Sequence, residues 1–319
     1  MIRVAVIGVG HLGRHHARIY ANLEGVKLVG VCDINEDRGR SVAAEYGSDF
    51  YRDYRELIGK IDAASLAVPT VDHCTIGCEL LSQGIAVLVE KPIARTLTEA
   101  DELINTARRH GVYLQIGHLE RFNPAVIAVR EIITLPRFFE THRLSLFSPR
   151  SLDIDVVMDL MIHDLDVIAW FVKSPVINIS AAGIPVISSR VDIANARLEF
   201  ANGCIANITA SRISNEKVRK LRLFQPHDYI SLDYLNQQAG IWSLRRMPTD
   251  GKGVPEIEAR ALPVVSDEPL RAELAAFVQA LMTAQPPLVS GEDGRAALAL
   301  ALQVGERLAE HAQRIGLNF

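Results

Sequence analysis

The sequence predicts an α/β Rossmann domain with a parallel sheet, followed by an α+β domain with a large, mostly antiparallel sheet. Up to residue 118, short β-branched apolar runs alternate with helical segments, as is typical of a parallel sheet with helices on both faces. From residue 137 to 265 strand patterns dominate, and residues 204–210 alternate between apolar and polar. We therefore expect domains at 1–118 and 119–319, with the C-terminal helix packing back toward the first.

The first domain is expected to follow strict strand–helix alternation. Its strands are predicted at 3–7, 26–32, 49–51, 63–68, 85–89 and 112–117. Its helices are predicted at 15–22, 38–46, 54–57, 72–83 and 99–110. Thr98 is expected to cap the last of these helices, and Gly111 to end it.

The second domain is expected to be rich in strands. They are predicted at 139–147, 176–183, 193–200, 204–211, 219–224, 229–234 and 240–246, with one helix at 154–172. Residues 249–255 contain Gly251, Gly253 and Pro255 and are expected to form a surface loop. Helices are expected at 268–284 and 291–315.

The composition is that of an ordinary globular protein. Of 319 residues 49% are apolar and 23% charged, and the net charge of −4 gives no electrostatic reason to expect nucleic acid or an anionic membrane as partner. No apolar stretch is long enough to span a membrane, and the first residues are needed as a strand rather than a signal peptide. A cytoplasmic location is expected.

The chain has four cysteines, Cys32, Cys74, Cys78 and Cys204. In a cytosolic chain they are expected to be reduced. Cys74 and Cys78 share a helix face, but no further ligands follow at zinc-like spacing. The prediction is small buried thiols and no metal.

The most specific local motif is the run Gly8-Val9-Gly10-His11-Leu12-Gly13. It follows a predicted strand and opens a helix, which is the context of a dinucleotide fingerprint. Gly8 permits the tight turn, Gly10 lets the backbone approach a pyrophosphate, and Gly13 lets the helix pack closely. The run is therefore predicted to bind the phosphates of a dinucleotide at the helix N-terminus.

Asp33 ends the second strand, about twenty residues beyond the fingerprint. A carboxylate there accepts hydrogen bonds from ribose hydroxyls and repels a 2′-phosphate, so Asp33 favours NAD over NADP. The adjacent Ile34 is also expected to contact the cofactor. Nearby Arg38 weakens this preference, because arginine accommodates the phosphate. The alternative is a helix-capping Asp33.

Two further strand ends are expected to face the cofactor. Pro69 and Thr70 follow one buried strand, and His73 is either a cofactor contact or a helix-start residue with a local hydrogen bond. Glu90, Lys91 and Pro92 follow the next strand. A lysine there carries its ammonium into the cleft, and Pro92 fixes the turn.

Asp159 and His163 are the candidates for proton chemistry. They are one helical turn apart, and a carboxylate beside an imidazole orients the ring as a general base. Asp155 continues the stripe. The alternatives are a solvated helix face, or a metal held by His163 with Asp164 or Asp166, although no second histidine stands at ligand spacing.

These motifs, in this order and approximate spacing, resemble the Gfo/Idh/MocA oxidoreductase family over essentially the whole chain. The resemblance implies NAD(P)-dependent oxidation or reduction of hydroxyl or keto groups on sugars and cyclitols. It places Lys91 beside the nicotinamide and the reacting hydroxyl. It makes His163 the general base or acid, with Asp159 modulating it or binding substrate. Which of Lys91 and His163 is the formal base stays open.

The segment that follows the last Rossmann strand resembles that of family members acting on UDP-linked N-acetyl sugars, in particular UDP-N-acetylglucosamine 3-dehydrogenases. The resemblance makes the substrate a nucleotide sugar rather than a free sugar or cyclitol. Its candidate substrate contacts are His118, Arg121, Asn123 and Arg150. The alternative is a linker in which Arg121 pairs with Glu120 or Asp155.

The exposed face of the large sheet is expected to form a homodimer or homotetramer. One rival interpretation is another reductase on this architecture, acting on a tetrapyrrole or a diol. A second rival is a non-catalytic dinucleotide sensor. Lys91 and His163 argue against it, because a sensor needs neither.

Overall fold

The computed structural model describes residues 1–147, 154–246 and 254–317, and these residues form two compact units. Unit 1 comprises Met1–Leu119 and Glu268–Leu298, and unit 2 comprises Glu120–Asp267 and Ala299–Phe319. The sequence pattern placed 119–319 in the second domain, with its C-terminal helix packing back toward the first. The structure instead returns Glu268–Leu298 to the first unit, because this segment carries part of that unit's core.

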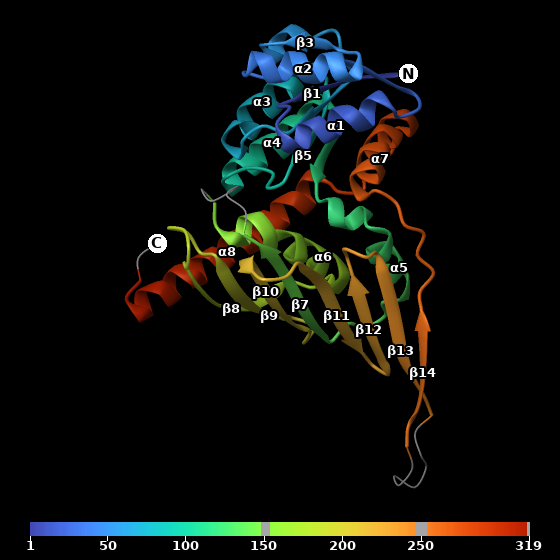
Figure 1. Ribbon diagram of the computed structural model, residues 1–319, viewed down its shortest axis with the longest axis vertical. Helices are drawn as coiled ribbons and strands as arrows, with labels where there is room; N and C mark the ends of the chain where they lie inside the picture. Colours follow the sequence, from blue (N-terminus) through green and yellow to red (C-terminus); the bar gives the residue numbers. More distant parts are fainter. Residues whose placement is uncertain (148–153, 247–253, 318–319) are drawn as a thin grey trace. The chain divides into compact units, whose positions relative to one another are not determined.

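Unit 1 is a parallel sheet flanked by helices (Figure 1). Its strands run in the order β3-β2-β1-β4-β5-β6, which is the doubly wound arrangement. The strands are β1 (Ile2–Ile7), β2 (Val26–Cys32), β3 (Asp49–Tyr51), β4 (Ala63–Leu66), β5 (Ala86–Glu90) and β6 (Leu114–Gly117). The helices are α1 (His11–Ala21), α2 (Glu36–Tyr46), η1 (Tyr54–Leu57), α3 (Thr70–Ser82), α4 (Leu97–His110) and α7 (Pro269–Thr283).

Polar side chains cap the starts of α2 and α4. The side chain of Asn35 accepts a hydrogen bond from the Arg38 backbone and starts α2. Thr96, rather than the predicted Thr98, caps α4 by accepting from the Glu99 backbone at 3.2 Å. Gly111 ends α4 in the left-handed conformation, as expected.

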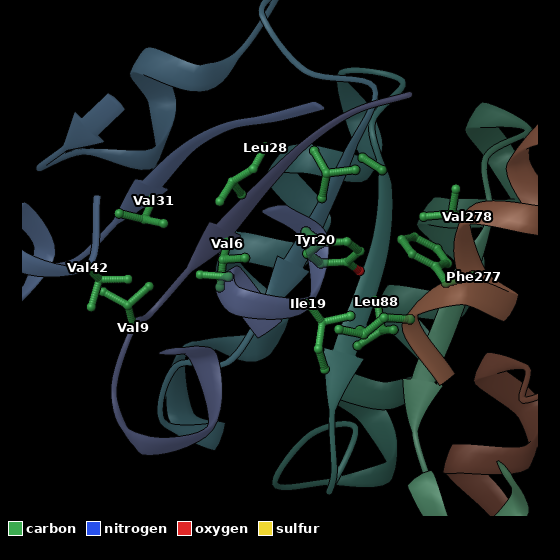
Figure 2. Packing of buried hydrophobic residues seen from close by; sticks show 14 of the residues in the cluster. Val6, Val9, Ile19, Tyr20, Leu28, Val31, Val42, Leu88, Phe277 and Val278 are labelled. Atoms are coloured by element: carbon green, nitrogen blue, oxygen red, sulfur yellow. The ribbon is translucent and has the colours of Figure 1, made fainter. Parts of the chain in front are cut away.

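The core of unit 1 joins helices that are distant in sequence. Figure 2 shows Ile19 and Tyr20 of α1 beside Leu88 of β5, with Phe277 and Val278 of α7 closing the cluster. Tyr20 and Phe277 are both 0% exposed. Helix α7, which lies far from the other helices of unit 1 in sequence, therefore completes the core of that unit.

Unit 2 is built on a sheet with the order β14-β13-β12-β11-β7-β10-β9-β8. The pair β7–β10 is parallel and the other neighbouring pairs are antiparallel. The strands are β7 (Phe138–Leu146), β8 (Val176–Ile184), β9 (Ile193–Phe200), β10 (Ile205–Ser214), β11 (Val218–Gln225), β12 (Asp228–Asp233), β13 (Gln238–Arg246) and β14 (Glu256–Ala261). The other elements are η2 (Leu119–Phe122), α5 (Pro124–Ile132), η3 (Val157–Met161), α6 (Ile162–Val172) and α8 (Gly291–Ile315), of which α8 begins in unit 1.

Two elements of unit 2 differ from the sequence expectation. The edge strand β14 was not predicted, because all of its residues are exposed and it has no buried face to create an apolar pattern. Helix α5 was also missed, although Asn123 followed by Pro124 is a helix-start signal. No helix within the described ranges is long and apolar enough to cross a membrane.

Replacing Phe277 by Ala is expected to lower the free energy of unfolding of unit 1 by about 3–5 kcal/mol, because it leaves a cavity in the cluster of Figure 2. Urea denaturation followed by circular dichroism measures the loss. The control is Gln279→Ala on the exposed face of α7, which is expected to stay within about 0.5 kcal/mol. Equal stability of the two variants would contradict the assignment of α7 to this core.

Candidate active site

The turn between β1 and α1 is built on glycines because backbone segments meet there. Gly8 has φ +82°, and a Cβ on it would lie 2.7 Å from the carbonyl oxygen of Ala67. A Cβ on Gly13 would lie 1.8 Å from the carbonyl oxygen of Gly8. No atom of the described residues lies within 4 Å of a Cβ built on Gly10, which is the N-cap of α1. The helix N-terminus is therefore open to an anion.

The carboxylate of Asp33 is already surrounded by donors. Oδ2 accepts from the Val9 backbone at 2.9 Å, and Oδ1 accepts from the Asn35 backbone at 2.8 Å. Arg38 adds two more hydrogen bonds, from Nε at 3.0 Å and from Nη2 at 2.7 Å. Burial alone would raise the pKa of Asp33, but these hydrogen bonds outweigh it and lower the pKa. Asp33 is therefore an anion whose accepting capacity is nearly used.

A cleft of about 990 Å³ lies along this edge of the sheet in unit 1. It brings together six of the residues predicted to bind the cofactor, Gly8, Gly10, Asp33, Ile34, Arg38 and Pro69. Its far wall, which the sequence patterns did not predict, contains Arg52, Tyr54 and Arg55. In the sequence, the only indication that these three residues line the cleft is that they follow the third parallel strand. The other predicted cofactor residues, His11, Leu12, Gly13, Thr70, His73, Glu90 and Lys91, do not line this cleft.

Lys91 begins the turn that follows β5, and its backbone N–H donates to Oε2 of Glu90 at 3.2 Å. The Lys91–Pro92 peptide is cis. His73 is 1% exposed, and its two ring nitrogens lie 3.0 Å from the carbonyl oxygens of Val68 and Pro92. Burial lowers the pKa of His73, so the neutral ring donates to one of these carbonyls at a time. His73 thus joins the turn after β4 to the turn of Lys91.

A second acid lies inside unit 1. Glu273 of α7 is 0% exposed, and its carboxyl oxygens have no hydrogen-bond partner among the described residues. Burial raises its pKa well above the ordinary range, and the charge of Glu90 adds to the effect. Burial and the charge of Glu90 therefore both favour the neutral form of Glu273.

Asp159 and His163 lie where a π-helical turn, η3, leads into α6. Such turns are frequent at functional sites. His163 is 9% exposed and Asp159 is half-buried. Arg219 of β11 is an electrostatic neighbour of Asp159. Asp155 does not extend their stripe, because its Oδ1 caps the turn by accepting from the backbones of Val157 and Met158.

The residue after His163 fixes α6 to the sheet. Asp164 receives two hydrogen bonds from Arg143 of β7, at 2.7 and 3.1 Å, and both residues are 1% exposed. Arg143 also donates to Glu120 at 2.9 Å. Burial alone would lower the pKa of Arg143, but the two carboxylates outweigh it and raise the pKa.

Arg121 and Asn123, predicted to contact substrate, form buried internal contacts. Arg121 is 3% exposed and binds Asp166 of α6 through Nε at 2.9 Å and Nη2 at 2.6 Å. Asn123 donates to the carbonyl of Tyr234 and accepts from the Ala125 backbone. Asp166 thus receives an arginine, as Asp164 does, and neither carboxylate is presented as a metal ligand.

One group of three potential metal donors occurs among the described residues. The Sγ atoms of Cys74 and Cys78 and a carboxylate oxygen of Glu102 lie within 4.8 Å of one another. Glu102 lies on α4, so the search for metal ligands close to the two cysteines in sequence did not find it. Burial raises the pKa of both thiols, which opposes the thiolate form that binds metals.

Lys91 and His118 belong to unit 1, whereas Asp159 and His163 belong to unit 2. His118 is 1% exposed. Arg150 lies outside the described residues.

Comparison with known proteins gives matches over both units. Residues 2–118 match the model of the oxidoreductase family with an NAD-binding Rossmann fold. Residues 138–225 match the GFO/IDH/MocA C-terminal domain.

Individual relatives extend over the full chain. A UDP-N-acetylglucosamine 3-dehydrogenase from Acidithiobacillus ferrooxidans is 37% identical over 98% of this chain and 99% of its own. A crystal form of that enzyme has a TM-score of 0.91, covering 97% of this chain and 98% of that one. A myo-inositol 2-dehydrogenase from Thermotoga maritima is 25% identical over 97% of each chain.

Replacing Glu273 by Gln is expected to raise stability at alkaline pH. Because the native pKa lies above the unfolded value of about 4.5, the native state binds more protons, and stability falls as pH rises between the two values. Glutamine has no proton to lose, so this fall disappears. Thermal unfolding from pH 5 to 9 measures it, with exposed Glu24→Gln as control. A melting temperature that falls as steeply as in wild type would contradict a neutral Glu273.

Proposed function

The chain belongs to the Gfo/Idh/MocA oxidoreductase family, and on that premise we propose that it oxidises carbon 3 of a UDP-linked N-acetyl sugar with NAD. The observation that carries the proposal is the 37% identity, over 98% of the chain, to a UDP-N-acetylglucosamine 3-dehydrogenase. The chain has an NAD-binding Rossmann domain and is a dehydrogenase of the class that acts on sugar hydroxyls. The substrate and the preference for NAD are the proposal.

The cofactor fits the features of unit 1. The open backbone at Gly10 is proposed to hold the pyrophosphate, and Asp33 to hold the adenosine ribose. Because Arg38 occupies both oxygens of Asp33, the ribose hydroxyls have to displace part of that ion pair. NAD, when bound, accepts the hydride.

The protein's own residues are proposed to manage the proton. His163 takes the hydroxyl proton, and Asp159 orients or charges the imidazole. Lys91 donates a hydrogen bond to the oxygen as it gains alkoxide character. Arg121 and Asn123 are proposed to support the site indirectly rather than to contact the substrate. Their polar atoms bind Asp166, Tyr234 and Ala125. Arg150 is the proposed cation for the sugar nucleotide.

A cyclitol dehydrogenase is the second candidate. The observation in its favour is the full-length similarity, at 25% identity, to a myo-inositol 2-dehydrogenase. The higher identity to the nucleotide-sugar enzyme favours the first proposal.

We also propose a cytoplasmic homodimer or homotetramer formed through the face of the large sheet. Phe224, Tyr229 and Trp242 lie side by side on three adjacent strands of that sheet, with ring centroids 5.0 and 5.1 Å apart. Phe224 and Trp242 are each 39% exposed, which favours a partner surface. A monomer in sedimentation velocity at micromolar concentration would contradict this assembly.

The first test is a panel of UDP-sugars, free sugars and inositols with NAD, read by NADH absorbance and by mass analysis of the products. UDP-N-acetylglucosamine is expected to give the highest kcat/KM. Lys91→Ala is expected to lower kcat by at least about 100-fold and to leave NAD affinity within about threefold. The control is Lys27→Ala, an exposed lysine of β2. Turnover with inositol alone would favour the second candidate.

The second test concerns the choice of dinucleotide. Arg38→Leu is expected to raise the discrimination against NADP in kcat/KM by about tenfold, because Asp33 then repels a 2′-phosphate without its counter-charge. Asp33→Ser is expected to shift the ratio in the opposite direction. Improved use of NADP by the Arg38 variant would contradict the assigned ribose site.

A further inference from the structure

Three buried polar side chains form a chain of contacts that ends at the backbone of Lys91. His16 and Ser65 are 0% exposed and Glu90 is 6% exposed. Nδ1 of His16 lies 2.7 Å from Oγ of Ser65, and Nε2 lies 3.0 Å from Oε1 of Glu90. The other oxygen of Glu90 accepts the N–H of Lys91 at 3.2 Å. These contacts connect β4 and α1 to the end of β5, where Glu90 accepts the backbone N–H of Lys91.

The order serine, histidine, carboxylate resembles a nucleophilic triad, but burial excludes that chemistry. A nucleophilic hydroxyl has to reach its substrate, and Ser65 is 0% exposed inside β4. The imidazole instead has two fixed neighbours of different kinds. Nε2 approaches Oε1 of Glu90 as an ion-pair contact outside hydrogen-bond geometry, and Nδ1 lies within hydrogen-bond distance of the Ser65 hydroxyl. Ser65 fixes the ring, and the ring fixes the carboxylate.

The carboxylate of Glu90 has little room to move. Glu90 pairs with Gly117 of β6, and a Cβ on Gly117 would lie 2.8 Å from Oε2 of Glu90. The glycine therefore leaves space for this one side chain. Any larger residue there displaces the acceptor of the Lys91 N–H.

Glu273, the buried acid of α7, also influences the charge near Glu90. Burial and the charge of Glu90 raise the pKa of Glu273, which favours its neutral form. A charged acceptor makes a stronger hydrogen bond to a backbone N–H than a neutral one. The negative charge therefore lies on Glu90, the residue that accepts the Lys91 N–H.

We propose that His16 is a positioning residue for Lys91 and acts through the carboxylate of Glu90. The proposal rests on the role of Lys91 in the proposed function. His16 touches neither cofactor nor substrate. It sets the orientation of Glu90, which fixes the peptide group from which the Lys91 side chain extends. A displacement of about 1 Å at a reacting group is enough to lower a rate by about 100-fold.

Two substitutions of His16 separate the roles of its two ring nitrogens. In His16→Gln, the introduced amide nitrogen falls near the position of Nε2 and can donate to Glu90. In His16→Asn, the shorter side chain reaches only the position of Nδ1 and Ser65. We expect kcat of the Gln variant to stay within about threefold of wild type and kcat of the Asn variant to fall about 10- to 100-fold. The dissociation constant of NADH, from fluorescence titration, is expected to change less than about twofold in both.

Hydrogen–deuterium exchange at the Lys91 amide gives a readout that needs no substrate. Exchange is expected to be faster in His16→Asn than in His16→Gln. If no UDP-sugar is oxidised by the wild type, the proposed function fails, and amide exchange still decides the positioning role. The control is His110→Asn, the same change of side chain at an exposed position at the end of α4. It is expected to leave kcat and exchange unchanged.

Gly117→Ala is the second variant, for use if His16→Asn does not fold. It pushes the carboxylate of Glu90 without removing any polar group, and it is expected to lower kcat and to accelerate exchange at Lys91. The proposal is overturned if the Gln and Asn variants have equal kcat and equal exchange. It is also overturned if NADH affinity falls in parallel with kcat, because a general loss of unit 1 structure then explains both.

Discussion

Removing a charged group from water costs several kcal/mol per ion, and the pairing that offsets this cost holds the elements around the site in place. In unit 2, Arg143 of β7 binds Asp164, and Arg121 of η2 binds Asp166. Both aspartates belong to α6, close to His163 in sequence. Because each arginine makes at least two hydrogen bonds to its carboxylate, α6 has little freedom to rotate or slide. The position of His163 thus depends on charges that take no part in the chemistry.

In unit 1, the cost of burying carboxyl groups is offset in two different ways. Arg38 and backbone donors compensate the charge of Asp33, whereas burial and the charge of Glu90 favour the protonated form of Glu273. A buried carboxyl that stays protonated avoids a second negative charge beside Glu90. The charge that remains lies at the end of β5, next to the turn that carries Lys91. Charge placement inside the domain is therefore part of how the functional edge of the sheet is built.

The sequence predicts the features that depend on neighbouring residues. The close approach of Gly13 to Gly8 is written in one contiguous motif, and Asp33 follows at a fixed interval. Partners brought together by folding are different. His16 meets Ser65 across 49 positions, and no periodicity encodes which buried hydroxyl a histidine will face. Asp164 and Asp166 could be read as metal ligands only because their arginines are distant in sequence. Edge strand β14 has no buried face and hence no pattern.

The support around Lys91 follows from the nature of the side chain. A lysine ammonium sits on a flexible four-carbon stem, so its position is only as well defined as the backbone from which the stem starts. In unit 1, Glu90 accepts the N–H of Lys91, and the ring of His73 reaches the carbonyl of Pro92. The peptide groups on the two sides of the turn are thus held by different side chains. Both side chains are buried; Glu90 also contacts His16, and the neutral His73 ring donates to the carbonyl of either Pro92 or Val68. Because the turn is held at both peptide groups, the flexible side chain of Lys91 extends from a well-defined backbone position.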